Sequence, residues 1–251
     1  MRALSLFSGI GGIDIACEWA GIHTAAFCEW AEFPRKVLRK HWPDTPIYED
    51  VRTLTKERLV TDGVIGPGRT IELIHGGYPC QPFSLAGNRE GANDDRHLWP
   101  QVARLLQEIR PNWFVGENVA GHITLGLDEV LSELDDIGYT AQPFIIPAAA
   151  IGAMHRRDRV FIVANSDRKR LQGGENSRRS GEMRKRIEQQ FSRLHATNTW
   201  SNVPASEFGR KADGISGKLD RSDRVHALGN AVMPAQIYPI IAAIKEIHRM
   251  Q

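Results

Sequence analysis

The stretch Gly76-Gly77-Tyr78-Pro79-Cys80-Gln81-Pro82-Phe83-Ser84 places one cysteine between two prolines, directly after the largely apolar run of residues 71–75. The glycines allow a sharp turn and the prolines restrict it, so we expect the thiol of Cys80 to project from the carboxyl end of a strand. Open α/β sheets bind their ligands at that edge. The stretch therefore predicts an α/β fold with a candidate nucleophile where ligands bind.

The rest of the chain alternates strand-like runs with helical patterns. Strands are expected at residues 3–7, 24–28, 71–75 and 113–116, helices at 12–20, 33–41, 98–109 and 127–137, a closing pair of strands at 140–147 and 159–164, and a last helix at 235–247. Such alternation with short connections predicts a mostly parallel sheet with helices on both faces.

The composition, with 41% hydrophobic and 25% charged residues in 251, is ordinary for a soluble globular protein. No uncharged run approaches the roughly 18 residues that a membrane span needs, so we expect no membrane association. The three cysteines, Cys17, Cys28 and Cys80, have neither a disulfide framework nor metal-ligand spacing. We therefore expect a reduced, cytoplasmic protein without a metal.

Charge is distributed unevenly along the chain. The net charge is only +2, yet residues 166–224 hold 14 Lys or Arg and 8 Asp or Glu, an excess of six positive charges. Such a segment either meets a polyanion or forms a solvated charged loop. The composition predicts a discontinuous catalytic body at 1–164 and 225–251, separated by a small basic region at 165–224.

A glycine-rich turn, Phe7-Ser8-Gly9-Ile10-Gly11-Gly12, follows the first expected strand. Turns of this kind let a ligand approach the backbone at a helix N-terminus. The dinucleotide spacing is incomplete because residue 14 is Asp rather than Gly, so a purely structural turn stays open.

Two further strand ends carry groups that suit an adenosine. Glu29 and Trp30 follow the second strand, where a carboxylate can bind ribose hydroxyls and an indole can stack on adenine. Asp50, after the next short extended segment, suits an adenine amino group. Each has a plain alternative, since Glu29 can cap a strand end and Trp30 can belong to the core.

Glu117 ends the strand expected after Cys80, and parallel neighbouring strands would bring the two together. A carboxyl group beside a thiolate is what addition to a pyrimidine ring requires. Arg157 and Arg159 lie on one face of a later strand because side chains alternate along it. They can hold a base carbonyl and the carboxylate, although such a pair is also common at a protein surface.

These motifs, with Gly229-Asn230-Ala231-Val232-Met233-Pro234, resemble those of the DNA (cytosine-5-)-methyltransferases in order and spacing. The resemblance covers about residues 1–164 and 225–247, and the arginine-rich middle is similar to small phage and prophage members. It implies a Rossmann-like, S-adenosylmethionine-dependent methyltransferase fold with an inserted target-recognition region, and double-stranded DNA as the partner of a monomeric, nucleoid-associated enzyme.

The resemblance also implies roles for individual residues. Cys80 would add to carbon 6 of an extruded cytosine, Glu117 would bind ring nitrogen 3 and the amine, Arg159 the carbonyl, and Arg157 would brace the site. The expected S-adenosylmethionine contacts are Phe7, Ser8, Gly9, Gly11, Gly12, Glu29, Trp30, Asp50, Val51, Pro79, Leu98, Asn230 and Ala231. The expected DNA contacts are Gln81, Ser84, Arg89, Arg96, Arg168, Arg178 and Arg210.

The chain departs from the family pattern at His155, where glutamine is usual before the arginine pair. Three other functions stay open: an RNA methyltransferase on this fold, a DNA-binding protein without turnover, and a nicotinamide-dependent oxidoreductase. The intact set of Cys80, Glu117, Arg157 and Arg159 disfavours the second, and the incomplete glycine spacing disfavours the third. Neither the DNA sequence recognised nor a partner nuclease can be read from the chain.

Overall fold

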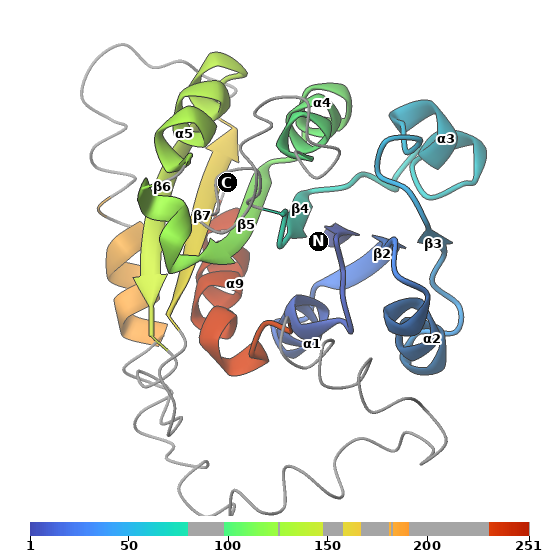
Figure 1. The fold of residues 1–251 in the computed structure, drawn as a ribbon, viewed down its shortest axis with the longest axis horizontal. Coiled ribbons are helices and arrows are strands. Elements are labelled where there is room, and N and C mark those ends of the chain that lie inside the picture. Colours follow the sequence, from blue (N-terminus) through green and yellow to red (C-terminus); the bar gives the residue numbers. More distant parts are fainter. Residues whose placement is uncertain are drawn as a thin grey trace, which may run out of the picture.

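The computed structural model describes residues 1–79, 98–124, 126–147, 158–166, 181, 183–190 and 231–250. They form a seven-stranded sheet in the order β3-β2-β1-β4-β5-β7-β6 (Figure 1). The strands are β1 (Arg2–Leu6), β2 (His23–Cys28), β3 (Ile47–Tyr48), β4 (Leu73–Gly76), β5 (Trp113–Val119), β6 (Tyr139–Ile146) and β7 (Arg159–Ser166). The strands β1 to β5 pair in parallel, and β7 pairs antiparallel with both β5 and β6. The predicted mostly parallel sheet is confirmed.

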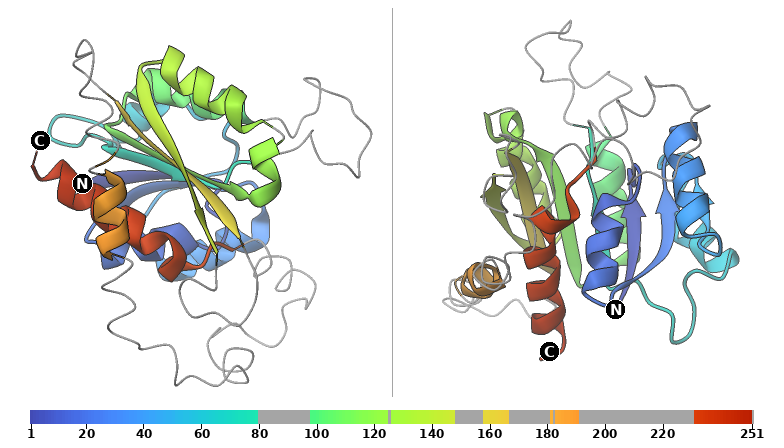
Figure 2. Two further views of the ribbon diagram at one scale, coloured as in Figure 1. Left: turned by 90° about the vertical axis from the view of Figure 1, so that its left-hand side faces the viewer. Right: turned by 90° about the horizontal axis from the view of Figure 1, so that it is seen from below.

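Helices cover both faces of the sheet, also as predicted (Figure 2). One hydrophobic cluster joins the sheet to α1 (Gly12–Trp19) and α9 (Pro234–His248), and the other joins it to α3 (Lys56–Thr61), α4 (Trp99–Ile109) and α5 (Leu127–Asp136). Neighbouring strand residues alternate between these clusters: Ala3 packs with α1 and α9, whereas Leu4 packs on the opposite face.

The strand order reverses between β1 and β4. The chain leaves β1 toward β2 on one side, and β4 follows on the other side of β1. Leu6 pairs with Gly76 at the last position of both strands, so the glycine-rich turn and the Cys80 stretch begin at the same level. Ligands of open α/β sheets bind at such a switch point.

Some boundaries differ from those expected. The strand β4 begins at Leu73 rather than residue 71, and β5 continues through Val119 because it pairs there with β7. The sequence pattern missed α3 and the short 3₁₀ helix η2 (Ala120–Thr124). Both are too short to show a helical period; α3 is set instead by its N-cap, where the Thr55 hydroxyl accepts a hydrogen bond from the Arg58 amide.

Part of the basic segment packs on the body of the protein. Residues 183–190 are helical, and Met183 and Ile187 are buried in the cluster that contains α9. Gln190 donates to Glu246 of α9 at 2.9 Å. Figure 2 shows this helix, in orange, beside the red α9. Composition predicted little core in this region, but two apolar residues four positions apart are sufficient to anchor one helical face.

The described part of the chain includes no helix long and apolar enough to cross a membrane. Within the same residues, no group of three or more His, Cys, Asp or Glu side chains is arranged to hold a metal ion.

Candidate active site

The glycine-rich turn leaves β1 and enters α1 through left-handed backbone conformations. Gly9 and Gly11 have φ values of 56° and 86°, and Phe7, which lies beyond the end of β1, has a φ of 50°. Glycine adopts such conformations without a steric cost, whereas Phe7 is strained there. The Ser8 amide donates to the Cys28 carbonyl, which ties the turn to the end of β2. The motif is therefore a tight turn directed at the switch point.

The segment before α9 crosses this turn. A Cβ atom on Gly12 would lie 2.2 Å from the carbonyl oxygen of Val232, so the two backbones touch. Ala231, one of the expected cofactor contacts, precedes Val232 and is half-buried. The structure thus brings the first and last motifs of the sequence into contact; the division at 1–164 and 225–251 stays a prediction.

Gly12→Ala is expected to lower the free energy of unfolding by about 1–3 kcal/mol, because the new methyl group must displace backbone rather than a flexible side chain. Binding of S-adenosylhomocysteine should weaken as well. Thermal unfolding and calorimetric titration measure both effects. Gly121→Ala is the matched control, since a Cβ there would meet nothing within 4 Å; equal stability of the two variants would contradict the proposed contact.

Glu29 links the glycine-rich turn to the start of α2 (Glu32–His41). Its carboxylate accepts from the Gly9 amide and from the Ala31 amide, both at 2.8 Å. The carboxylate therefore lies beside the turn, and its expected role in binding ribose hydroxyls stays a prediction. The simpler expectation, that Glu29 caps a strand end, describes part of what it does in this structure.

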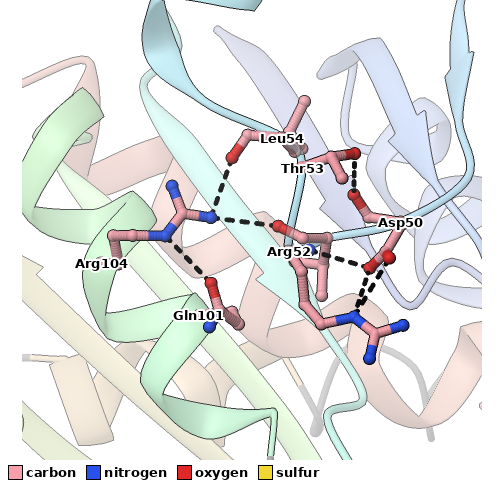
Figure 3. A network of polar contacts seen from close by, with 7 residues as sticks. Asp50, Arg52, Thr53, Leu54, Gln101 and Arg104 are labelled. Carbon is pink, nitrogen blue, oxygen red and sulfur yellow. Dashed lines mark hydrogen bonds and ion pairs between the residues drawn. The ribbon is translucent and has the colours of Figure 1, made fainter.

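Trp30, Asp50 and Arg52 form a small group next to this turn. The Trp30 side chain is 67% exposed, so it does not belong to the core. The Arg52 guanidinium lies 5.4 Å from the Trp30 ring centroid, and its Nε is 3.0 and 3.1 Å from the Asp50 oxygens (Figure 3). Hydrogen bonding to Arg52 lowers the pKa of Asp50. An open aromatic face and an ionised acceptor are thus available for an adenine.

Trp30→Ala is expected to weaken cofactor binding by about 1–3 kcal/mol if base–aromatic stacking has its usual strength. Calorimetric titration with S-adenosylhomocysteine measures the change. Trp19→Ala is the control, because Trp19 is also exposed but contacts Tyr238 on α9. An unchanged affinity for Trp30→Ala would remove this residue from the pocket.

The other expected cofactor residues that the structure describes surround these groups. Val51 is buried beside Asp50, Leu98 is half-buried at the N-cap of α4, and Pro79 is exposed at the end of the described β4 segment. Neither Arg52 nor Arg104, which contacts Val51, was singled out from the sequence. Arg104 donates to backbone carbonyls, which have no sequence signature, and Arg52 lies in an irregular segment without a motif.

Glu117 and Arg159 form an ion pair at the edge where β5 ends. Arg159 Nε lies 2.6 Å from Glu117 Oε1, although the N–H does not point along the contact, and both side chains are largely buried. A Cβ on Gly77 would lie 2.6 Å from the other carboxylate oxygen of Glu117. The carboxylate therefore faces the turn that leads to Cys80. The expected contact of Arg159 with a base carbonyl stays a prediction.

The start of that turn is fixed by two residues that the sequence did not reveal as important. Asn118 Nδ2 donates to the Tyr78 carbonyl at 3.1 Å, and the Tyr78 hydroxyl lies 2.9 Å from Nε2 of the buried His122. Burial lowers the pKa of His122. Asn118 could have been suspected from the Glu-Asn-Val motif, but His122 lies in a short helix without a sequence signature.

The two described cysteines are unsuited to nucleophilic attack. Burial raises the pKa of Cys28 to about 12 and that of Cys17 well above its ordinary value. A thiolate, rather than a thiol, is the nucleophile. With three cysteines in the chain, Cys80 is the remaining candidate.

Several expected site residues lie outside the described residues. They are Cys80, Arg157 and Asn230 and the expected DNA contacts Gln81, Ser84, Arg89, Arg96, Arg168, Arg178 and Arg210. Their roles stay predictions.

Curated proteins of known type are similar to this chain in sequence. Type II methyltransferase M.AquIA of Picosynechococcus sp. is 35% identical over 178 residues, which are 65% of this chain and 71% of that protein. Type II methyltransferase M.CviJI of Paramecium bursaria Chlorella virus IL3A is also 35% identical, over 65% of this chain and 42% of its own length.

Solved structures share the fold. A DNA modification methyltransferase encoded within an E. coli prophage superposes with a TM-score of 0.54 at 25% identity, over 66% of this chain and 47% of its own. The S. pombe Dnmt2 methyltransferase superposes with a TM-score of 0.57 at 20% identity, over 88% of this chain and 62% of its own. This chain thus spans only part of these proteins, and less than half of M.CviJI.

The family model of the C-5 cytosine-specific DNA methylases matches residues 1–216, which are most of the chain. The chemistry of this family is the S-adenosylmethionine-dependent methylation of cytosine in DNA. This chain therefore belongs to the C-5 cytosine-specific DNA methylase family.

Proposed function

We propose that this chain transfers a methyl group from S-adenosylmethionine to carbon 5 of a cytosine within a short DNA sequence, through a covalent bond to Cys80. The observation that carries the proposal is the position of the Glu117 carboxylate. It is held by Arg159 and lies against Gly77, three residues before Cys80, at the sheet edge where the glycine-rich turn begins.

The described residues fit the cofactor. The turn has left-handed glycines, the Glu29 carboxylate lies beside it, and Trp30 presents an open ring. Glu29 would bind the ribose, Trp30 would stack on the adenine and Asp50 would accept from its amino group, with the backbone of the turn along the rest of the molecule. When bound, S-adenosylmethionine supplies the methyl group from its sulfonium to carbon 5.

The chain's own residues make carbon 5 reactive. The Cys80 thiolate adds to carbon 6, which moves an electron pair to carbon 5, while the Glu117 carboxyl group shares its proton with ring nitrogen 3 and accepts a hydrogen bond from the exocyclic amine. After carbon 5 has been methylated, a base removes its proton, the carbon 5–carbon 6 double bond re-forms and the thiolate leaves. Arg159 keeps the Glu117 carboxylate oriented throughout. The products are 5-methylcytosine, S-adenosylhomocysteine, one proton and the unchanged enzyme.

DNA must present the cytosine outside the duplex, because carbon 6 cannot be reached within the base stack. We assign this step to the Cys80 stretch and to the basic region at 165–224, whose arginines suit phosphates and guanine edges. The proposed partner is double-stranded DNA, bound by a monomer without a metal.

Incubation with mixed-sequence duplex DNA and labelled S-adenosylmethionine, followed by single-base mapping of 5-methylcytosine, tests the proposal. Methylation confined to one short motif is the expected result. Label in structured RNA but not in DNA would show an RNA methyltransferase. DNA binding without label in either nucleic acid, at saturating cofactor, would leave a binding protein and overturn the proposal.

A further inference from the structure

The connection from Asp50 to α3 is held by one face of α4. Residues 50–55 lie outside any helix or strand, yet they carry Asp50 and Val51, which we assign to the cofactor. Figure 3 shows the Arg104 side chain of α4 directed at the backbone of this connection, whereas the Arg52 side chain, from the connection itself, is directed at Asp50. The two segments are about fifty residues apart in sequence, so the contact is tertiary rather than local.

The Arg104 side chain donates to two backbone carbonyls of the connection. Its Nη2 donates to the Val51 carbonyl at 3.1 Å and to the Leu54 carbonyl at 2.9 Å. The side chains of Val51 and Leu54 are buried in the core, and the Leu54 amide donates to the Val51 carbonyl at 3.4 Å. The guanidinium nitrogen thus reinforces a turn that the backbone closes only through a long hydrogen bond, and it ties that turn to α4.

The guanidinium is itself oriented by its own helix. Its Nε donates to Gln101 Oε1 at 3.0 Å and its Nη1 to Glu108 Oε1 at 2.7 Å. The second oxygen of Glu108 accepts from the Lys56 amide at 3.1 Å, at the start of α3. The residues Gln101, Arg104 and Glu108 thus lie on one face of α4 and hold both ends of the connection.

We infer that Arg104 is a positioning residue for the cofactor: by fixing the Val51 and Leu54 carbonyls it holds Asp50 where it meets the adenine. The inference rests on the proposed function, because it needs Asp50 to contact the cofactor. Without Arg104 the connection must be ordered when the cofactor binds, which weakens affinity. Lysine cannot replace it fully, since an ammonium lacks the planar fork that reaches two carbonyls and Glu108 together.

Calorimetric titration with S-adenosylhomocysteine tests the inference. Arg104→Met is expected to raise the dissociation constant at least about tenfold, the equivalent of one lost charge-assisted hydrogen bond, and Arg104→Lys by less. The Michaelis constant for S-adenosylmethionine should rise in parallel, with a smaller change in kcat. Gln107→Met, an exposed substitution on the same helix, is the control and should bind like the wild type.

Hydrogen exchange supplies a local readout that general destabilisation would not reproduce. The Thr53 amide donates to the Asp50 carbonyl at 3.1 Å, so a peptide covering 50–56 should exchange faster in Arg104→Met than in wild type, with β1 and β5 unchanged. Unchanged exchange in this peptide, or faster exchange across the whole sheet, would overturn the inference.

A double-mutant cycle with Asp50→Ala separates this inference from the proposed function. We expect Asp50→Ala to weaken binding and Arg104→Met to add little to it, because both changes act on one carboxylate. Fully additive effects would overturn the inference and leave the cofactor site intact. If wild type does not bind S-adenosylhomocysteine, or Asp50→Ala binds normally, the assignment of the site itself fails.

Discussion

Cys80→Ser is expected to abolish methyl transfer, by a factor of at least about 10³, while leaving the affinity for S-adenosylhomocysteine unchanged. A serine hydroxyl is barely ionised at neutral pH, so the addition to carbon 6 that activates the ring does not occur. Cofactor binding depends on groups that the substitution does not touch, such as Glu29 and Trp30. Single-turnover methyl transfer and calorimetric titration separate the two effects.

A second measurement addresses the covalent bond. In duplex DNA containing 5-fluorocytosine, carbon 5 carries no removable proton after methylation, so the enzyme should remain attached to the base. Wild type should form an adduct that survives denaturation, and Cys80→Ser should form none. Cys17→Ala removes a buried thiol and should still form the adduct. Turnover by Cys80→Ser would disprove the covalent mechanism.

Glu117→Gln is expected to reduce the rate of methyl transfer by about 10²–10⁴, the usual contribution of a positioned acid or base. The amide keeps the shape of the carboxylate but cannot share a proton with ring nitrogen 3. It also leaves the largely buried Arg159 guanidinium without the carboxylate 2.6 Å away. Rapid-quench measurement of a single turnover, with enzyme in excess over DNA, gives the rate.

The matched control is Glu57→Gln, the same chemical change at an exposed position on α3. It should transfer methyl groups at the wild-type rate. If Glu117→Gln lost activity only because it is less stable, its melting temperature would be lowered. Its activity would then recover when the assay is run at a lower temperature. A Glu117→Gln rate within threefold of wild type at full folding would remove Glu117 from the proposed chemistry.

The sequence predicted the sheet well because its signals are local. The strands were recognisable as short apolar runs because both of their faces are buried, as Ala3 and Leu4 on opposite faces show, and the glycine-rich turn was recognisable from its glycines. The proximity of Glu117 to the Cys80 stretch also followed from strand order, since parallel neighbours end at one edge. The contact between Glu117 and Gly77 agrees with that expectation.

Other parts of the site could not be predicted, because they depend on contacts distant in sequence. Arg104 donates to backbone carbonyls, which have no sequence signature. The hydrogen bond between His122 and the Tyr78 hydroxyl forms only when β4 and β5 are paired. The contact between Gly12 and Val232 likewise joins residues 220 positions apart. Strand patterns establish which elements form; they do not establish which side chain will meet a given carbonyl.

The contact between Gly12 and Val232 has a consequence for synthesis on the ribosome. At translation rates of roughly 5–20 residues per second, the nascent chain would make its glycine-rich turn on the order of 10–45 s before the segment that covers it. During that interval the apolar face of α1 can pack on strand residues such as Ala3, but the part that is later buried against α9 has no cover yet. Under the proposed function, the cofactor site would therefore be completed late in translation, after Cys80 and Glu117 have emerged.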